Sequence, residues 1–280
     1  MKIETVTCKG VSECNEDAVI INDNISVYGV ADGASSIIPF FTQENETGGF
    51  IASNLVKNYY ESLPYCNSFL DDFAKINMQL QHKMKEYLID TSKKEQLWGT
   101  ALALVKISPN RIDFIQTGDC MIFAVYDSGF VRVLTRAQTE SLEGVAINKW
   151  KELIDKGIHK QKDLREGVED ILISMRQRSN TFAGYGVLNG ENDAVKFTEF
   201  GKINRNGLKH LVMVTDGLFL PKEWVSEQDC YWEVMIRKIF SKGLQAYAND
   251  LIELEATDPE CVRYPRFKMS DDKSGVWITF

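Results

Sequence analysis

Clustered basic charge is the first feature that this 280-residue chain lacks. Its formal net charge is −8 and its pI is about 5.1, whereas surfaces that bind nucleic acid or anionic membranes carry clustered lysine and arginine. No apolar run approaches the roughly 20 residues that a membrane-spanning helix requires. We therefore expect neither nucleic acid nor a membrane as a partner.

Histidine and paired cysteine, which are common zinc ligands, are also scarce. The three histidines, His82, His159 and His210, are far apart, and the six cysteines include no Cys-x-x-Cys pair. This distribution argues against zinc hydrolases and against most histidine-based acid–base schemes. In a chain of this length we interpret the cysteines as reduced, separate thiols. Because the first residues also lack a hydrophobic signal core, we expect a cytoplasmic protein.

The chain has no Pro- or Ser-rich linker, no low-complexity stretch and no internal repeat. Its length and its apolar content of 44% are sufficient for one large core. We therefore predict a single domain over residues 1–280, and we expect a monomer.

The most informative stretch is Gly29-Val30-Ala31-Asp32-Gly33-Ala34, an apolar strand that ends in an aspartate and a glycine. A similar pattern, Val-Met-Val-Thr-Asp-Gly, occurs late in the chain at residues 212–217. Two strands that each carry an aspartate beyond the last apolar residue can deliver two carboxylates to one place. Hard divalent cations bind to oxygen-rich clusters of this kind.

A β-hairpin is predicted over residues 18–21 and 25–31, because the turn cluster Asn-Asp-Asn separates two apolar runs. Glu16 and Asp17 precede the first strand, and Asp32 follows the core of the second. These two ends are neighbours in an antiparallel pair. The residues alone therefore predict that the three carboxylates lie close together.

Periodic apolar patterns predict both helices and strands. Helical spacing occurs over residues 50–60, 69–88, 150–155, 164–176, 232–240 and 244–254. Strand patterns occur over residues 2–8, 211–214 and 275–280, and four successive strands over 99–107, 111–117, 121–126 and 130–134 read as an antiparallel meander. This order predicts an α+β fold in which β-sheets are flanked by helices. Residues 137–207 are the least regular part of the chain.

Six short motifs follow one another along the chain. They are Asn15-Glu16-Asp17, Ala31-Asp32-Gly33, Gly99-Thr100, Gly118-Asp119, Thr215-Asp216-Gly217 and Asp271-Asp272-Lys273-Ser274. In order and approximate spacing they resemble the metal-dependent PPM/PP2C-type serine/threonine protein phosphatases. The resemblance implies a central antiparallel β-sandwich flanked by pairs of helices, in four α-β-β-α layers. It also implies that the variable segment 137–207 carries a flap beside the active site.

The resemblance further implies a reaction, the hydrolysis of phosphoserine and phosphothreonine on protein substrates. A water that bridges two divalent cations, Mn²⁺ or Mg²⁺, would be the nucleophile, and no phosphoenzyme intermediate would form. Oxygen ligands suit these two ions, and a water bound to them has a lowered pKa. The cysteines need not be nucleophiles, and we interpret them as small apolar residues.

The resemblance assigns the metal ions to seven residues, which are Glu16, Asp17, Asp32, Gly33, Asp119, Asp216 and Asp272. The predicted catalytic set within them is Asp17, Asp32, Asp216 and Asp272. Asp32 would bridge the two ions, the Gly33 carbonyl would be a further ligand, and Asp216 and Asp272 would bind one ion directly. Glu16 and Asp17 would hold or orient metal-bound waters, and Asp119 would serve a third, weaker metal site.

Several positions depart from the family's pattern. Many members carry an arginine that binds the substrate phosphate four residues before Glu16, where this chain has Ser12. A serine donates one hydrogen bond but supplies neither charge nor a bidentate fork. Lys9 is the other candidate for this contact. Leu220 stands where an acidic residue is common, and Lys273 stands where asparagine is usual.

These departures leave alternatives open. The first is an active phosphoprotein phosphatase. The second is a weakly active or non-catalytic regulatory relative that binds metal or a partner. The third is a small-molecule phosphoesterase that uses the same metal ions.

Overall fold

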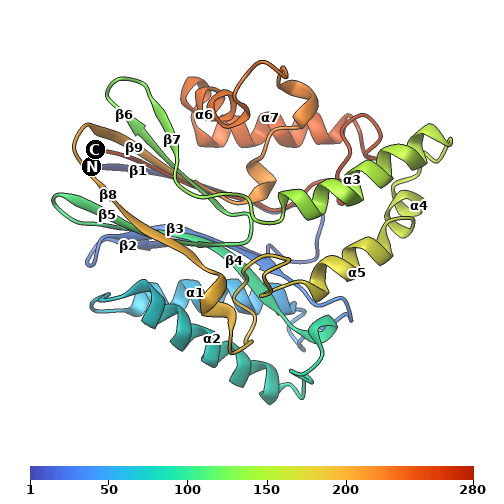
Figure 1. The fold of residues 1–280 in the computed structure, drawn as a ribbon, viewed down its shortest axis with the longest axis horizontal. Helices are drawn as coiled ribbons and strands as arrows, with labels where there is room; N and C mark the ends of the chain where they lie inside the picture. The colour runs from blue at the N-terminus through green and yellow to red at the C-terminus, as the bar shows by residue number, and fades with distance from the viewer.

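Apolar strands pair into two antiparallel five-stranded sheets in the computed structural model, which describes residues 1–280. The order of the first sheet is β1 (Lys2–Cys8), β10 (Lys273–Thr279), β9 (Leu208–Val214), β6 (Met121–Tyr126) and β7 (Val131–Val133). The order of the second sheet is β2 (Asp17–Asn22), β3 (Val27–Ala34), β4 (Gly99–Ile107), β5 (Arg111–Thr117) and β8 (Glu199–Asn204). The sheets stack as two inner layers, with the chain termini side by side (Figure 1).

Two helix pairs form the outer layers (Figure 1). The second sheet is covered by α1 (Gly48–Ser62) and α2 (Phe69–Glu86), and the first by α6 (Tyr231–Lys242) and α7 (Leu244–Ala256). The side chains of Thr47 and Ser68 cap α1 and α2 by accepting hydrogen bonds from backbone amides. The predicted α+β sandwich with four α-β-β-α layers is confirmed.

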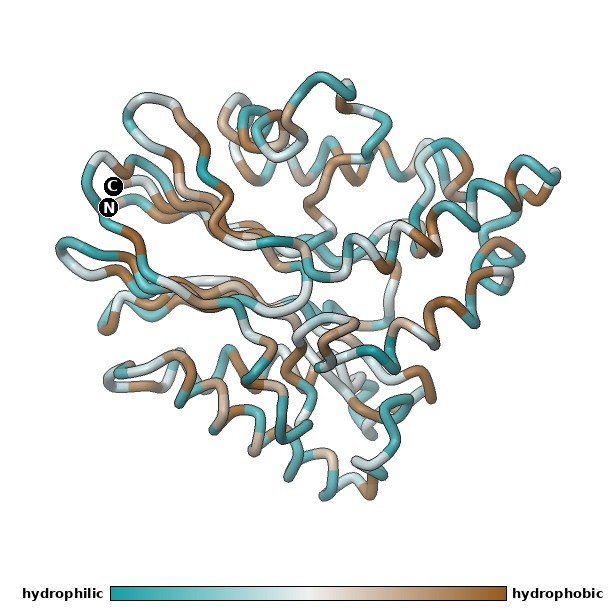
Figure 2. Tube along the Cα trace, viewed as in Figure 1, coloured by the Kyte–Doolittle hydropathy of each residue, from teal (hydrophilic) through white to brown (hydrophobic).

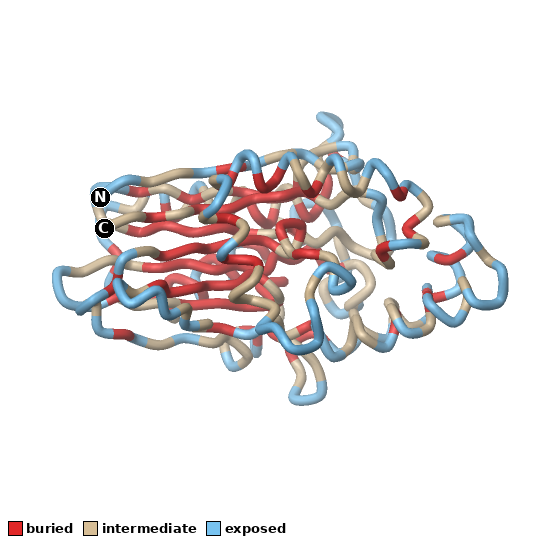
Figure 3. The backbone as a smooth tube through the Cα atoms, turned by 90° about the horizontal axis from the view of Figure 1, so that it is seen from above, coloured by how far each residue is buried: buried red, intermediate tan, exposed pale blue.

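Alternation along the strands fills both the space between the sheets and the space under the helices. In β3, Tyr28 and Val30 pack between the two sheets, whereas Val27 and Ala31 pack under α1 and α2. Apolar residues accordingly run along both sheets in Figure 2, and buried residues follow the same strands in Figure 3. The strands are thereby fixed from both sides, and their ends have defined positions.

The four strands predicted as one meander are present, but they belong to two sheets. β4 pairs with β5 in the second sheet, and β6 pairs with β7 in the first. The chain crosses between the sheets at Gly118-Asp119. Gly118 has a φ of +65°, a conformation that glycine adopts without steric cost. The single meander was therefore a wrong prediction, and the crossing places Asp119 between the two sheets.

The helices of the segment 137–207 lie beyond one end of the sandwich (Figure 1). The segment contains α3 (Glu140–Asp155), α4 (Gln161–Glu166) and α5 (Glu169–Gln177), and it returns as the unpredicted edge strand β8. The helix predicted over 150–155 is only the end of α3, and the helix predicted over 164–176 is interrupted between α4 and α5. Four short 3₁₀ turns complete the chain, namely η1 (Lys94–Gln96), η2 (Ala194–Phe197), η3 (Asp216–Leu218) and η4 (Lys222–Trp224).

None of the helices combines the length and the apolar character needed to cross a membrane.

Candidate metal centre

The hairpin of β2 and β3 brings the first two carboxylates together. Asp17 lies directly opposite Asp32 in the antiparallel register, and the Gly33 amide donates to the Glu16 carbonyl at 3.0 Å. A Cβ at Gly33 would lie 2.3 Å from the carbonyl oxygen of Gly49, so that only glycine fits where β3 passes the start of α1. The predicted proximity of the hairpin ends is therefore found.

The other sheet supplies Asp216, which follows β9 at the start of η3. Thr215, just before it, connects the sheets. Its hydroxyl donates to Asp17 Oδ2 at 2.8 Å and accepts from the amide of Ser274 at 3.0 Å. The end of β9 is thus tied both to the start of β2 and to β10.

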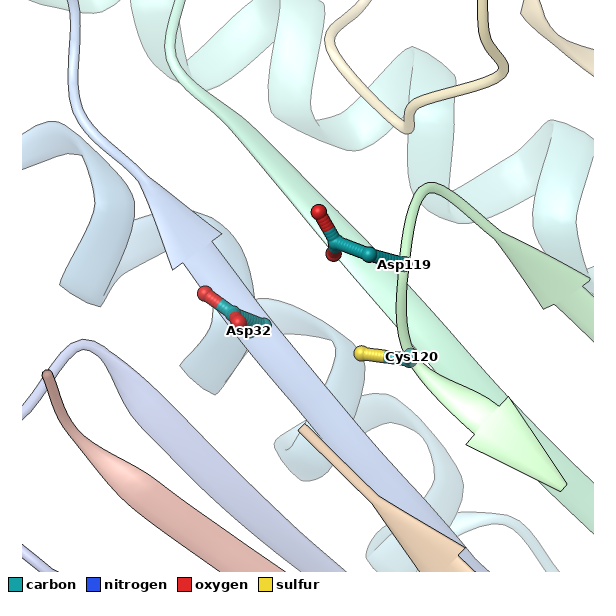
Figure 4. A group of neighbouring side chains, drawn as sticks. All are labelled: Asp32, Asp119 and Cys120. Carbon is teal, nitrogen blue, oxygen red and sulfur yellow. The ribbon is translucent and has the colours of Figure 1, made fainter. Parts of the chain in front are cut away.

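Asp119 reaches the same place from the crossing between β5 and β6. Figure 4 shows the carboxylates of Asp32 and Asp119 approaching each other, with the thiol of Cys120 beside them. One potential ligand atom from each of these three residues lies within 4.8 Å of the others. Burial raises the pKa of the Cys120 thiol well above its usual value, and hard cations prefer oxygen to sulfur. We therefore assign the metal-binding potential of this group to its carboxylates.

The two aspartates of the terminal motif have different surroundings. Asp272 accepts hydrogen bonds from the amides of Gly10 and Glu16, one on each carboxylate oxygen and both at 2.7 Å. After burial, the charges of both aspartates contribute to the raised pKa of Asp17, and the charge of Asp271 also contributes to the raised pKa of Asp216 and Asp32. Asp272, the residue predicted as a ligand, therefore joins backbone loops, while its neighbour Asp271 faces the other carboxylates.

We refer to Asp17, Asp32, Asp119, Asp216 and Asp271 as the acidic cluster. Burial is the largest cause of the raised pKa of Asp17, Asp32 and Asp216, and it is followed by repulsion from neighbouring carboxylates in Asp32 and Asp216. The pKa of Asp216 rises to about 7. Several carboxylates this close ionise together only when a counter-charge is present. The donor set, all oxygen and strongly negative, fits Mg²⁺ or Mn²⁺.

Glu143 is a further carboxyl that sequence reasoning missed. It lies on the first turn of α3, where burial and then the charges of Asp119 and Asp216 raise its pKa to about 8. Nearby, the hydroxyl of Thr139 donates to Asp119 Oδ2 at 2.9 Å. Its position in the first turn of a helix could have marked Glu143 in the sequence. The predicted helix, however, began at residue 150, ten residues after the observed start of α3 at Glu140.

The carboxylate of Glu16 has a different set of partners. Its Oε1 accepts hydrogen bonds from the hydroxyls of Ser35 and Thr47. Thr47 is the N-cap of α1, and a negative charge is favourable near a helix N-terminus. Glu16 thus fixes the loop that follows β3 against the start of α1.

The predicted phosphate contacts lie in the loop after β1. The Lys9 ammonium donates to the carbonyl of Glu13 at 3.2 Å, and the lysine is exposed. The amide of Val11 donates to the carbonyl of Ser270 at 3.1 Å. Ser12 is therefore carried beside the terminal motif, but the nearby lysine is bonded within its own loop.

A cavity of about 510 Å³ opens beside the acidic cluster. Its wall includes Asp216, Asp271 and Lys268, and α3 contributes Glu143. The Lys268 ammonium donates to Asp271 Oδ1 at 2.7 Å. Burial lowers the pKa of this lysine, but the charges of Asp271, Asp32 and Asp216 outweigh that effect and raise the pKa above its ordinary value. The carboxylates are therefore accessible to a small molecule or to a side chain.

Comparison of the sequence with protein-family profiles identifies the family of this chain. The sequence profile described as "Protein phosphatase 2C" matches residues 7–253, and the chain belongs to this family. No curated protein sequence matches the chain.

Solved structures show the same fold at low sequence identity. Serine/threonine phosphatase Stp1 from Staphylococcus aureus is 14% identical with a TM-score of 0.55, over 100% of this chain and 94% of that one. PppA, a regulatory component of T6SS in Pseudomonas aeruginosa, is 15% identical with a TM-score of 0.58, over 100% and 97%. The catalytic domain of the phosphatase PstP, in complex with two manganese ions, is 16% identical with a TM-score of 0.54, over 99% and 96%.

Proposed function

We propose that this chain is a metal-dependent protein serine/threonine phosphatase that hydrolyses phosphoserine and phosphothreonine without a phosphoenzyme intermediate. The observation that carries the proposal is the convergence of five aspartates from both sheets beside an open cavity. Membership of the Protein phosphatase 2C family supports it. The two manganese ions of the PstP structure support the choice of metal.

The acidic cluster would hold two cations, Mn²⁺ or Mg²⁺. We propose that Asp32 would hold both of them, with the Gly33 carbonyl as a further ligand. Asp216 would bind one ion, and Asp271 would take the place beside it that the resemblance gave to Asp272. We keep Asp119 as a ligand of a third, weaker site. When bound, such ions activate a water for in-line attack and neutralise the charge that develops on the phosphate.

The remaining residues of the site would keep this arrangement rigid. Asp17 is held by the hydroxyl of Thr215 at 2.8 Å, so its free oxygen would orient a water. Asp272 and Glu16 use their carboxylates to join the loops after β1 and β3 to the terminal motif and to α1. We propose that they position the ligands, because such supporting contacts orient a metal site.

We propose that the segment 137–207 acts as a flap over the cavity. Its helix α3 carries Glu143 toward the acidic cluster. Its helix α5 is joined to the loop after β3, since Arg176 Nη2 donates to the carbonyl of Ser35 at 2.6 Å. A bound phosphoprotein would therefore contact this segment as well as the metal centre.

The weakly active relative remains the second candidate, and one observation favours it. Ser12 supplies no charge, and the Lys9 ammonium donates to the carbonyl of Glu13 within its own loop. A phosphatase that lacks a cation at this position would bind its substrate weakly. The two candidates differ in turnover and not in metal binding.

Turnover separates these candidates. Purified protein should hydrolyse both p-nitrophenyl phosphate and a phosphothreonine peptide when Mn²⁺ or Mg²⁺ is present, and EDTA should abolish both reactions. A higher specificity constant for the peptide would favour a protein substrate, and the reverse order would favour a small-molecule phosphoesterase. Metal binding without turnover of either substrate would sink the phosphatase proposal and leave the regulatory relative.

Metal binding should also stabilise the fold. Because a cation relieves the repulsion within the acidic cluster and binds only the folded chain, excess Mn²⁺ should raise the midpoint of thermal unfolding. At a hundred times the dissociation constant the gain is about 2.7 kcal/mol, which corresponds to several degrees for a chain of this size. Differential scanning fluorimetry in EDTA and in Mn²⁺ measures the shift. An unchanged midpoint would argue against a cation site in the cluster.

A further inference from the structure

We propose that Lys268 binds the substrate phosphate and so replaces the arginine whose position is taken by Ser12. This inference rests on the proposed phosphatase function, and it identifies a cation on the cavity wall that is paired with the acidic cluster itself. The inference comes from the contacts of Lys268, which lies in the loop before β10. No motif in the sequence marked this residue.

Lys268 is the one basic side chain that forms an ion pair with a residue of the acidic cluster. Its ammonium lies 2.7 Å from Asp271 Oδ1. Its side chain is 43% exposed, and it forms part of the wall of the cavity beside Asp216. A phosphate that enters the cavity toward the aspartates would therefore meet this ammonium.

The other nearby lysines are engaged elsewhere. Lys9 donates to the carbonyl of Glu13. Lys273 is fully buried, where it forms an ion pair with Glu255 at 2.8 Å and donates to the carbonyl of Asp271 at 2.9 Å. Lys273 is thus buried and bound to the backbone under the cluster, whereas Lys9 is exposed but lies in the loop after β1 and not on the cavity wall.

The loop that carries Lys268 is held firmly at its backbone. Asp258 accepts from three successive amides, those of residues 262–264, and from Arg266. The Arg266 guanidinium also donates to the carbonyls of Glu255 and Met269 at 3.0 and 2.8 Å. The backbone on both sides of Lys268 is therefore fixed, while its side chain remains half exposed and free to exchange one anion for another.

Charge explains when that exchange would occur. A divalent cation bound to Asp271 competes with the ammonium of Lys268 for the same carboxylate. The displaced ammonium would then be free for a phosphate oxygen, which lysine contacts as a point charge rather than as a bidentate fork. Lys268 would in this way serve as counter-ion to Asp271 in the metal-free protein and as phosphate ligand in the loaded one.

The test compares Lys268→Gln and Lys268→Arg with the wild type and with Lys162→Gln, which removes an exposed lysine on α4. Isothermal titration calorimetry measures the binding of inorganic phosphate to each Mn²⁺-loaded protein, and separately the binding of Mn²⁺ to each metal-free protein. We expect Lys268→Gln to weaken phosphate binding about tenfold, or about 1.4 kcal/mol. Its affinity for Mn²⁺ should be unchanged or higher, because a competing cation has been removed. Lys268→Arg should retain phosphate binding, and Lys162→Gln should behave as the wild type.

Two results would overturn this inference. The first is phosphate binding that is absent from the wild type or unaffected in Lys268→Gln. The second is a fall in Mn²⁺ affinity in Lys268→Gln, since it would mean that the lysine only holds Asp271 in place. Turnover is a separate matter: a wild type that binds phosphate through Lys268 but cleaves no phosphoester would refute the phosphatase proposal and leave Lys268 as a ligand of phosphate alone.

Discussion

Asp32→Asn is expected to reduce turnover of a phosphothreonine peptide by about a thousandfold or more. Asp32 lies opposite Asp17 and close to Asp119, where it is proposed to hold both cations. The loss of this carboxylate would remove the charge that holds them together. A thousandfold fall corresponds to about 4 kcal/mol of transition-state stabilisation, within what bound metal ions supply. Steady-state kinetics in saturating Mn²⁺ measures the effect.

The same substitution separates catalysis from folding. Asparagine keeps the shape of the side chain and removes one charge from a repulsive cluster, so the variant should unfold in EDTA at the same temperature as the wild type or higher. Asp71→Ala, an exposed aspartate on α2, is the control and should keep full activity. Turnover in Asp32→Asn close to that of the wild type would contradict the proposed role.

The neighbouring aspartates 271 and 272 should have opposite effects when each is replaced by asparagine. Asp272→Asn converts one of its two acceptor oxygens into an amide donor, so that the amide of Gly10 or of Glu16 loses its partner. An unpaired buried donor costs about 1–3 kcal/mol, and the unfolding midpoint should fall in the presence and absence of metal. Asp271→Asn should leave the metal-free fold intact and weaken Mn²⁺ binding at least about a hundredfold.

Thermal unfolding in EDTA, together with Mn²⁺ titration of both variants, measures this contrast. If Asp272→Asn lost the metal while its metal-free stability stayed at the wild-type value, Asp272 would be the ligand that the resemblance implied. Until then the assignment of that ligand to Asp272 stays a prediction, and the structure favours the residue before it.

Local sequence was sufficient for the features that depend on one hairpin. The proximity of Asp17 and Asp32 follows from a short turn and two apolar runs, and the structure has that register. The strand before Asp216 and most of the helices were also predicted correctly, because each has a strong apolar periodicity of its own.

Contacts between distant segments could not be predicted in this way. β5 and β6 are both buried strands, and nothing in their composition says that the chain changes sheets at Gly118 between them. β8 alternates weakly and exposes Phe200 at the edge of its sheet, so it was missed. The different partners of Asp271 and Asp272 depend on the loop after β1, more than 250 residues earlier in the chain.

The same limit applies to Lys268 and Glu143. Each is an unremarkable charged residue in the sequence, and each reaches the acidic cluster only because a loop or a helix of another region folds over it. Such residues lie outside the short motifs that mark the family.

Calorimetric titration of Mn²⁺ into the metal-free protein tests the central claim, that the acidic cluster is a metal centre, most directly. We predict that the wild type binds two ions per chain, and that Asp32→Asn weakens the binding of both. The account would be contradicted if the wild type bound no Mn²⁺, or if Asp32→Asn bound Mn²⁺ with the stoichiometry and affinity of the wild type.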